Sequence, residues 1–168
     1  MMRRGVMLAA IALLAALVLA APAGAITYGT RDGDRHPEVG ALLAPQAGSL
    51  DGLRVGTRFT SVGYGAQSVS IDHGPSFHYA DVRYMATGGL LAVNPSWLRI
   101  SMNPARGDGG TCYGDSGGPN FLGAGPTETD IVAAITITGD AMCRATNVDH
   151  RLDTPSARVF LGQYVTLP

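Results

Sequence analysis

The sequence contains no lysine and few charged residues, and neither sign of charge forms a block. Its twelve basic residues, all arginine, and thirteen acidic residues give a formal net charge of −1 at pH 7. Nucleic-acid-binding proteins carry clustered positive charge, so we expect no nucleic-acid partner. The composition also excludes a disordered chain, because 46% of the 168 residues are hydrophobic and only 15% are charged. One globular domain with a real core is expected.

Residues that commonly bind metals are scarce as well. The chain has two cysteines, and its four histidines are His36, His73, His78 and His150. His73 and His78 flank a Gly-Pro turn, but two histidines without a third ligand nearby are a weak metal signal. We therefore expect no metal and no other cofactor, and interpret each histidine as solvated or packed.

A long apolar run occurs only at the amino terminus. Val6 to Ala21 is apolar, two arginines precede it, and Ala23-Gly24-Ala25 follows with small residues of the A-x-A type. This pattern predicts a secretory signal peptide over residues 1–25 and a secreted, extracellular protein. The alternative is an uncleaved membrane anchor, but sixteen apolar residues fall short of the ~20 that span a bilayer. In an exported protein the two cysteines imply one disulfide, Cys112 to Cys143.

One stretch concentrates glycine around a serine. Residues 107–119 read Gly-Asp-Gly-Gly-Thr-Cys-Tyr-Gly-Asp-Ser-Gly-Gly-Pro, which places glycines on both sides of Ser116. Glycine lets the backbone turn tightly and approach a ligand closely. An exposed serine hydroxyl with amide hydrogens beside it is the arrangement that acyl transfer needs. For a short match of this kind, an ordinary glycine-rich surface loop is the simpler alternative.

The full string resembles the nucleophile signature of the chymotrypsin/trypsin family of serine proteases, Gly-Asp-Ser-Gly-Gly-Pro at residues 114–119, with Cys112 before it. The resemblance implies that Ser116 is the acylated nucleophile and that the amides of Gly114 and Ser116 form the oxyanion hole. It also implies a primary specificity pocket with Gly110 at its floor and Ile137, Thr138 and Gly139 along its wall. Glycine at the floor favours an apolar or mixed side chain of a peptide or protein substrate over arginine or lysine.

The resemblance gives the predicted cleavage site a chemical meaning. Cleavage after Ala25 would expose Ile26, and Ile26-Thr27-Tyr28-Gly29-Thr30 resembles the mature start of a trypsin-like protease. In that family the freed α-amino group turns inward and pairs with the aspartate before the nucleophile, here Asp115. A buried carboxylate needs such a partner. Cleavage after Ala23 would instead leave two residues in front of Ile26 and prevent the pairing.

The family pattern breaks after Leu43. A complete protease would continue through its first barrel, with a catalytic histidine in a Thr-Ala-Ala-His-Cys type of motif and then a catalytic aspartate, and neither motif is present. The chain passes instead from Ala44-Pro45 to residues that resemble the approach to the second barrel, through a real deletion or a shortened gene model. None of the four histidines matches the catalytic one, and His36 falls at a surface position of the family.

The rest of the chain predicts an all-β fold. Turn-rich segments separate six apolar strands, as in a closed antiparallel barrel, at residues 58–64, 77–85, 97–102, 119–122, 131–138 and 147–152. A helix should follow, capped by Asp153 or Thr154, with Val159, Phe160 and Tyr164 on one face. The expected architecture is a chymotrypsin-like antiparallel β-barrel with a C-terminal helix, in which residues 26–52 are a remnant of the first barrel, about one strand, and residues 53–168 are the second barrel.

Two functions are compatible with this sequence. The first is a secreted serine endopeptidase, impaired because the histidine and aspartate of its triad are missing. The second is a non-catalytic pseudoprotease that binds peptides or proteins. A barrel that lacks its usual partner exposes apolar surface, so we also expect self-association.

Overall fold

The computed structural model describes residues 23–24, 26–33, 35–36, 43–71 and 74–168. Most of the predicted signal peptide and part of the predicted first-barrel strand, residues 37–42, lie outside the described residues. Among the described residues, no helix has the length and apolar character needed to cross a membrane.

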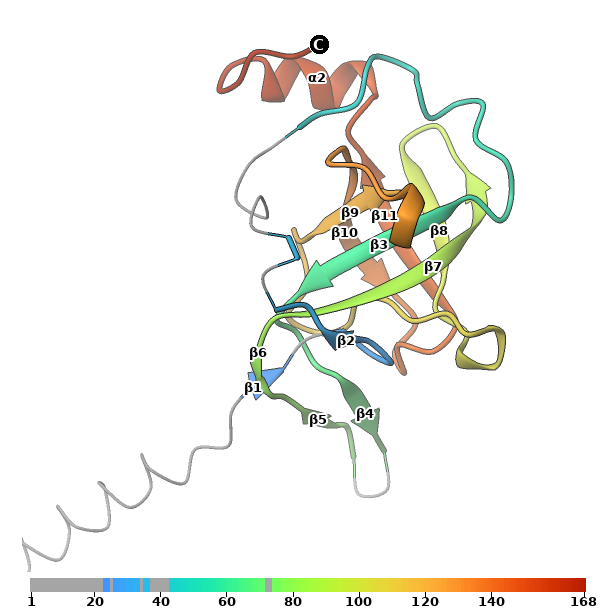
Figure 1. The fold of residues 1–168 in the computed structure, drawn as a ribbon, viewed down its shortest axis with the longest axis vertical. Helices are drawn as coiled ribbons and strands as arrows, with labels where there is room; N and C mark the ends of the chain where they lie inside the picture. The colour runs from blue at the N-terminus through green and yellow to red at the C-terminus, as the bar shows by residue number, and fades with distance from the viewer. Residues whose placement is uncertain (1–22, 25, 34, 37–42, 72–73) are drawn as a thin grey trace, which may run out of the picture.

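A closed antiparallel barrel of six strands forms the body of the molecule (Figure 1). The strands lie around the barrel in the order β7, β3, β9, β10, β11 and β8, and β8 pairs with β7 to close it. Their bounds are β3 (Arg58–Gly63), β7 (Tyr84–Val93), β8 (Trp97–Ser101), β9 (Pro119–Leu122), β10 (Val132–Gly139) and β11 (Thr146–Arg151). The prediction of an all-β barrel with a C-terminal helix is confirmed.

Shorter elements extend this barrel. β2 (Thr30–Arg31) pairs antiparallel with β7. β4 (Ser68–Ser70) and β5 (Ser76–His78) form a hairpin. β1 (Ala23–Gly24) pairs in parallel with β6 (Asp81–Val82). Two 3₁₀ turns, Pro104–Arg106 and Gly125–Thr127, and the helix α2 (Pro155–Leu161) complete the described elements.

The predicted strand at 77–85 is wrong in its bounds. Those residues form the end of β5, the short β6 and the start of β7, whereas the barrel strand itself runs to Val93. The Gly88-Gly89 pair in its middle concealed the strand, because glycine is depleted in strands. Here Gly88 is required by packing, since a Cβ on it would lie 2.4 Å from the carbonyl oxygen of Ser101.

Buried apolar side chains fill the barrel and also hold the loop before β3, residues 43–57, which is called here the junction loop. Leu50 joins Phe59, Leu90, Leu98 and Ile100 in one cluster, and each is at most 1% exposed. The Leu50 amide donates to the Asp153 carboxylate at 2.9 Å, which fixes the junction loop against the end of β11. The loop around Leu50 is therefore packed onto the barrel.

The helix α2 begins as predicted but buries a different face. The Thr154 hydroxyl accepts the Ala157 amide at 3.3 Å, and Pro155 occupies the first turn. Ala157 is the buried residue of the helix. Val159, Phe160 and Tyr164, which share a face in the sequence pattern, are 74%, 58% and 70% exposed.

Candidate functional site

Ser116 lies on the loop between β8 and β9, in a turn that glycines permit. Gly114 and Gly117 have φ values of 97° and 84°, in the left-handed region that side chains avoid. The Gly117 amide donates to the carbonyl of Thr136 on β10 at 2.8 Å, and the Thr136 amide donates to Gly118 at 3.0 Å. These bonds hold the turn against β10 with Ser116 exposed at its tip.

The amides of Gly114 and Ser116 are free to bind a ligand. Their neighbours are occupied, since the amides of Asp115 and Gly118 donate to the carbonyls of Cys112 and Asp115 at 3.0 and 2.8 Å. Neither the Gly114 nor the Ser116 amide donates to an acceptor in the described part of the chain, and both residues are exposed. Two unused amide donors within two residues of a serine hydroxyl are the groups that an oxyanion hole uses.

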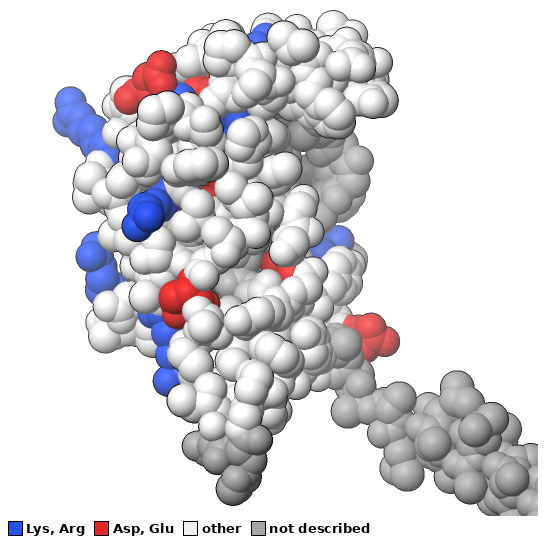
Figure 2. Space-filling view, turned by 180° about the vertical axis from the view of Figure 1, so that it is seen from behind, with Lys and Arg blue, Asp and Glu red and all other residues white. Residues whose placement is uncertain are grey.

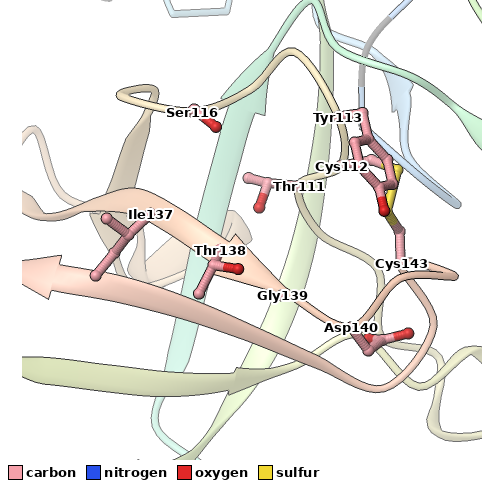
Figure 3. Close-up of a pocket in the computed structure, with 9 residues that line it drawn as sticks. All are labelled: Thr111, Cys112, Tyr113, Ser116, Ile137, Thr138, Gly139, Asp140 and Cys143. Atoms are coloured by element: carbon pink, nitrogen blue, oxygen red, sulfur yellow. A yellow bond between two sulfur atoms is a disulfide. The ribbon is translucent and has the colours of Figure 1, made fainter.

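A cavity of about 140 Å³ opens beside Ser116 (Figure 3). Ser116 and Thr111 on the loop face Thr138 and Gly139 on β10, and the disulfide lies at the far end. Its lining comprises Thr111, Cys112, Tyr113, Ser116, Ile137, Thr138, Gly139, Asp140 and Cys143. The predicted nucleophile and the three predicted wall residues thus surround one cavity.

Gly110, the predicted floor residue, does not line the cavity. A Cβ on Gly110 would lie 2.6 Å from Cγ of Met102, and one on Gly139 would lie 3.4 Å from Cε of Met102. The fully buried Met102 side chain therefore occupies the space behind both glycines.

The disulfide between Cys112 and Cys143 is confirmed, with 5.4 Å between the two Cα atoms. It joins the loop that carries Ser116 to the loop that follows β10. Both cysteines pack with Met102, Ala66 and Val69 in one buried cluster, which makes this wall of the cavity rigid.

Asp115 is buried beneath the turn, where it accepts hydrogen bonds from the backbone. The amides of Gly65 and Cys112 donate to its carboxylate at 2.7 and 2.9 Å, and the backbone amides of Ile26 and Tyr64 also favour its charged form. Burial raises the pKa of Asp115, and these amides offset part of that effect. A Cβ on Gly63 would lie 2.1 Å from the carboxylate, so glycine there leaves room for it.

The amino-terminal segment contacts the loop that carries Ser116 and the loop that follows β10. Ile26 is fully buried beside Asp115. Thr27 and Gly110 exchange backbone hydrogen bonds of 2.9 and 3.2 Å, and the Thr27 hydroxyl lies 3.1 Å from the Cys143 carbonyl. The segment therefore ties the nucleophile loop to the loop after β10.

The described histidines do not supply Ser116 with a base. His36 is buried rather than on the surface as expected, and it bonds the carboxylates of Asp32 and Glu128 and stacks on Phe121. His78 and His150 are absent from the lining of the Ser116 cavity, and His73 lies outside the described residues. The described residues also contain no group of three side chains suited to a metal ion.

Several cavity residues were missed by sequence reasoning. Thr111 and Tyr113 flank Cys112, so their closeness to the motif is the signal that could have identified them. Asp140 gave no such signal.

The Asp140 carboxylate stays ionised. Burial would raise the pKa of Asp140, but the amides of Thr146, Arg144 and other residues of the same loop lower that pKa below its ordinary value.

Comparison with models of known protein families gives no match, and comparison with curated proteins gives none either. The resemblance to trypsin-like proteases therefore depends on the residues of the motif and on the geometry around them.

Proposed function

We propose that this protein is a secreted relative of trypsin-like serine proteases that binds peptides at the Ser116 cavity and is catalytically impaired. The free amides of Gly114 and Ser116 beside an exposed serine hydroxyl carry this proposal. A peptide carbonyl seated there would place its oxygen on two donors and its carbon near the hydroxyl. One side chain of the peptide would enter the cavity.

The cavity limits the side chain that it can accept. Cavities of ~150 Å³ admit a group the size of benzene, so a cavity of about 140 Å³ suits a small or medium side chain. The Asp140 carboxylate accepts amides of its own loop at 2.8 to 3.3 Å, so its charge is already compensated there. An apolar or mixed side chain is the preferred occupant.

Chemistry at Ser116 is expected to be slow. Attack by the serine oxygen on the peptide carbonyl carbon forms the acyl–enzyme bond and breaks the peptide C–N bond. A neighbouring base must take the serine proton and deliver it to the leaving amine. No described histidine lies at the cavity. Loss of such a base from a triad lowers turnover by ~10⁴ to 10⁶, while the oxyanion donors and substrate binding retain ~10³ to 10⁴ over water.

The alternative, an active secreted endopeptidase, is favoured by one observation. Ile26 is fully buried, and its backbone amide is one of the groups that lower the pKa of Asp115. A free α-amino group at Ile26 would therefore lie where the activating ion pair of a trypsin-like protease forms.

Labelling by a serine-directed fluorophosphonate separates the two functions. For the impaired protein we expect labelling of the secreted chain slower than that of trypsin by about 10⁴ or more, and its complete loss in Ser116→Ala. Ser156→Ala, which removes an exposed hydroxyl on α2, is the matched control and should label as the parent does. Labelling at the rate of trypsin would show that a base is present and favour the endopeptidase. Binding of peptides unchanged by Thr138→Trp, which fills the cavity, would contradict the proposed site.

A further inference from the structure

A network of buried polar side chains joins strands β9, β10 and β11. Its centre is Asp149 on β11, which is 0% exposed, with Asn120 and Asn147 on either side, each at most 1% exposed. The side-chain amides of Asn120 and Asn147 both donate to Oδ1 of Asp149, at 2.9 and 2.6 Å. Buried polar groups are costly unless they are paired, so these bonds fix the three side chains in one arrangement.

One end of the network lies at the wall of the Ser116 cavity. Thr111, which lines the cavity on the loop that carries Ser116, donates its hydroxyl to Oδ1 of Asn147 at 2.7 Å. The same Asn147 side chain donates to Asp149. Asp149 is therefore linked to the nucleophile loop through a single intermediate side chain.

The other end of the network holds β10. The Thr136 hydroxyl accepts the side-chain amide of Asn120 at 3.1 Å, and this amide also donates to Asp149. The backbone of Thr136 makes the two hydrogen bonds that hold the turn after Ser116 against β10. Asp149 thus connects, through one asparagine on each side, to both segments between which the cavity lies.

The second oxygen of Asp149 indicates which form of the carboxyl fits this network. Oδ2 is buried and has no hydrogen-bond partner in the described part of the chain. A carboxylate needs donors for both oxygens, whereas a neutral carboxylic acid carries a proton on one oxygen and can donate it. Thr136 lies opposite Asp149 across the two strands, and its hydroxyl acts on this carboxyl. The neutral acid therefore satisfies the network better than the ion does.

The groups that face the Asp149 carboxyl are uncharged. Those that act on it are Thr136, Asn120 and Asn147, and its partner on β8 is Leu98. Burial raises the pKa of Asp149 well above its ordinary value, and the three polar neighbours offset only part of that effect. The neutral form is thus retained at low pH and is lost as pH rises through the folded pKa.

We propose that Asp149 is a positioning residue that, as a neutral carboxylic acid, holds the two walls of the Ser116 cavity in the geometry that binds a peptide. This inference rests on the proposed function of the cavity. It predicts that peptide binding weakens as pH rises, because the ionised side chain leaves Oδ2 without a donor. It also predicts that an amide side chain at residue 149 removes this dependence.

Fluorescence polarisation with a rhodamine-labelled hexapeptide of five glycines and one leucine tests the proposal. Its termini are blocked, so the peptide keeps its charge. The parent protein should lose roughly tenfold in affinity between about pH 5 and about pH 9. Asp149→Asn makes every bond of the neutral acid and should bind equally well throughout. Asp130→Asn, which neutralises an exposed carboxylate before β10, is the matched control and should keep the pH dependence of the parent.

Urea titrations of the parent and Asp149→Asn provide a second readout that does not depend on the peptide. An unfolded aspartate ionises near ~3.9, so a residue that stays neutral in the fold lowers stability as pH rises above that value. Asp149→Asn should therefore be more stable than the parent near about pH 7, with the difference shrinking toward about pH 4. Equal stability of the two proteins at both pH values, or failure of Asp149→Asn to fold, would overturn the neutral acid.

The two readouts distinguish this inference from the proposed function. Peptide binding with the same pH dependence in the parent and in Asp149→Asn would overturn the positioning role and leave the cavity as a peptide site. Peptide binding by neither protein would overturn the proposed function, and the positioning role with it. Loss of affinity with rising pH in the parent alone, together with the greater stability of Asp149→Asn, would support the inference.

Discussion

His36 shows, among single residues, how one side chain joins two parts of the molecule. Its ring nitrogens bond the carboxylates of Asp32 and Glu128, and Asp32 also accepts the Nε of Arg83 at 2.7 Å. Burial alone would lower the pKa of His36, but the two carboxylates outweigh burial and hold the pKa above its ordinary value. The imidazolium therefore fastens the amino-terminal segment to the loop that carries Glu128.

This arrangement predicts that stability falls as pH rises. A histidine whose pKa is raised by folding stabilises fully below its unfolded pKa, near ~6.5, and loses that contribution as pH rises through the folded pKa. His36→Gln should therefore lower the free energy of unfolding by roughly 1 to 2 kcal/mol at about pH 5.5 and by much less at about pH 8.5. Urea titrations at the two pH values measure the free energy of unfolding. His150→Gln is the control and should keep the pH dependence of the parent protein. An equal loss at both pH values would contradict the role given to His36.

The sequence could identify Ser116 and the β10 residues of its cavity, because the motif around Ser116 is a run of consecutive residues and the resemblance that it carries implies the β10 wall. The position of Met102 behind Gly110 was not predictable in this way. That contact joins two segments through the packing of one flexible side chain, and no residue spacing encodes it. The burial of His36 depends in the same way on Glu128, which is remote in sequence.

For whole elements, the amino-terminal segment has the clearest chemical consequence. Ile26 has a φ of 72°, a strained value for a β-branched residue within a chain. An amino-terminal residue has no preceding carbonyl and thus no such restriction. Cleavage before Ile26 would relieve this strain and also place an ammonium group beside Asp115, whose pKa is now raised by burial.

We therefore expect a chain that begins at Ile26 to be more stable than one that begins at Gly24. The difference should be about 3 kcal/mol near neutral pH, because a buried carboxylate that backbone amides compensate only in part gains an opposite charge. It should shrink as pH rises beyond the range of the α-amino group, ~8 in an unpaired terminus. Chemical denaturation of the two chains measures the difference, and Asp115→Asn is the control that should abolish it. Equal stability of the two chains would contradict the pairing.

Strands were predictable where apolar residues alternate between turn signals, and five of the six barrel strands lie within about two residues of the expected bounds. The bounds of β7 were not predictable, because the Gly88-Gly89 pair within this strand has low strand propensity. The strand forms there because the glycines allow close packing against β8. The exposed face of α2 was also unexpected. Helical periodicity identifies an apolar face but does not show whether another element covers it.

The molecule as a whole has an apolar surface around α2 that the described residues leave open. A cavity of about 480 Å³ lies between α2 and β10, lined by Ile135, His150, Leu152, Ser156, Ala157, Phe160 and Leu161. Val159 and Phe160 project beside it, and the end of the molecule that carries α2 shows few charged side chains in Figure 2. An exposed apolar surface of this kind favours association.

We expect the protein to form dimers or larger species at micromolar concentration through this surface. Phe160→Arg should shift the protein toward monomer, because a charged side chain cannot be buried there without a partner. Val55→Arg is the matched control, since Val55 is 72% exposed on the junction loop and should leave association unchanged. Sedimentation velocity over a range of concentrations measures the distribution. A parent protein that stays monomeric throughout would show that the barrel is self-sufficient and that the apolar surface around α2 is tolerated in water.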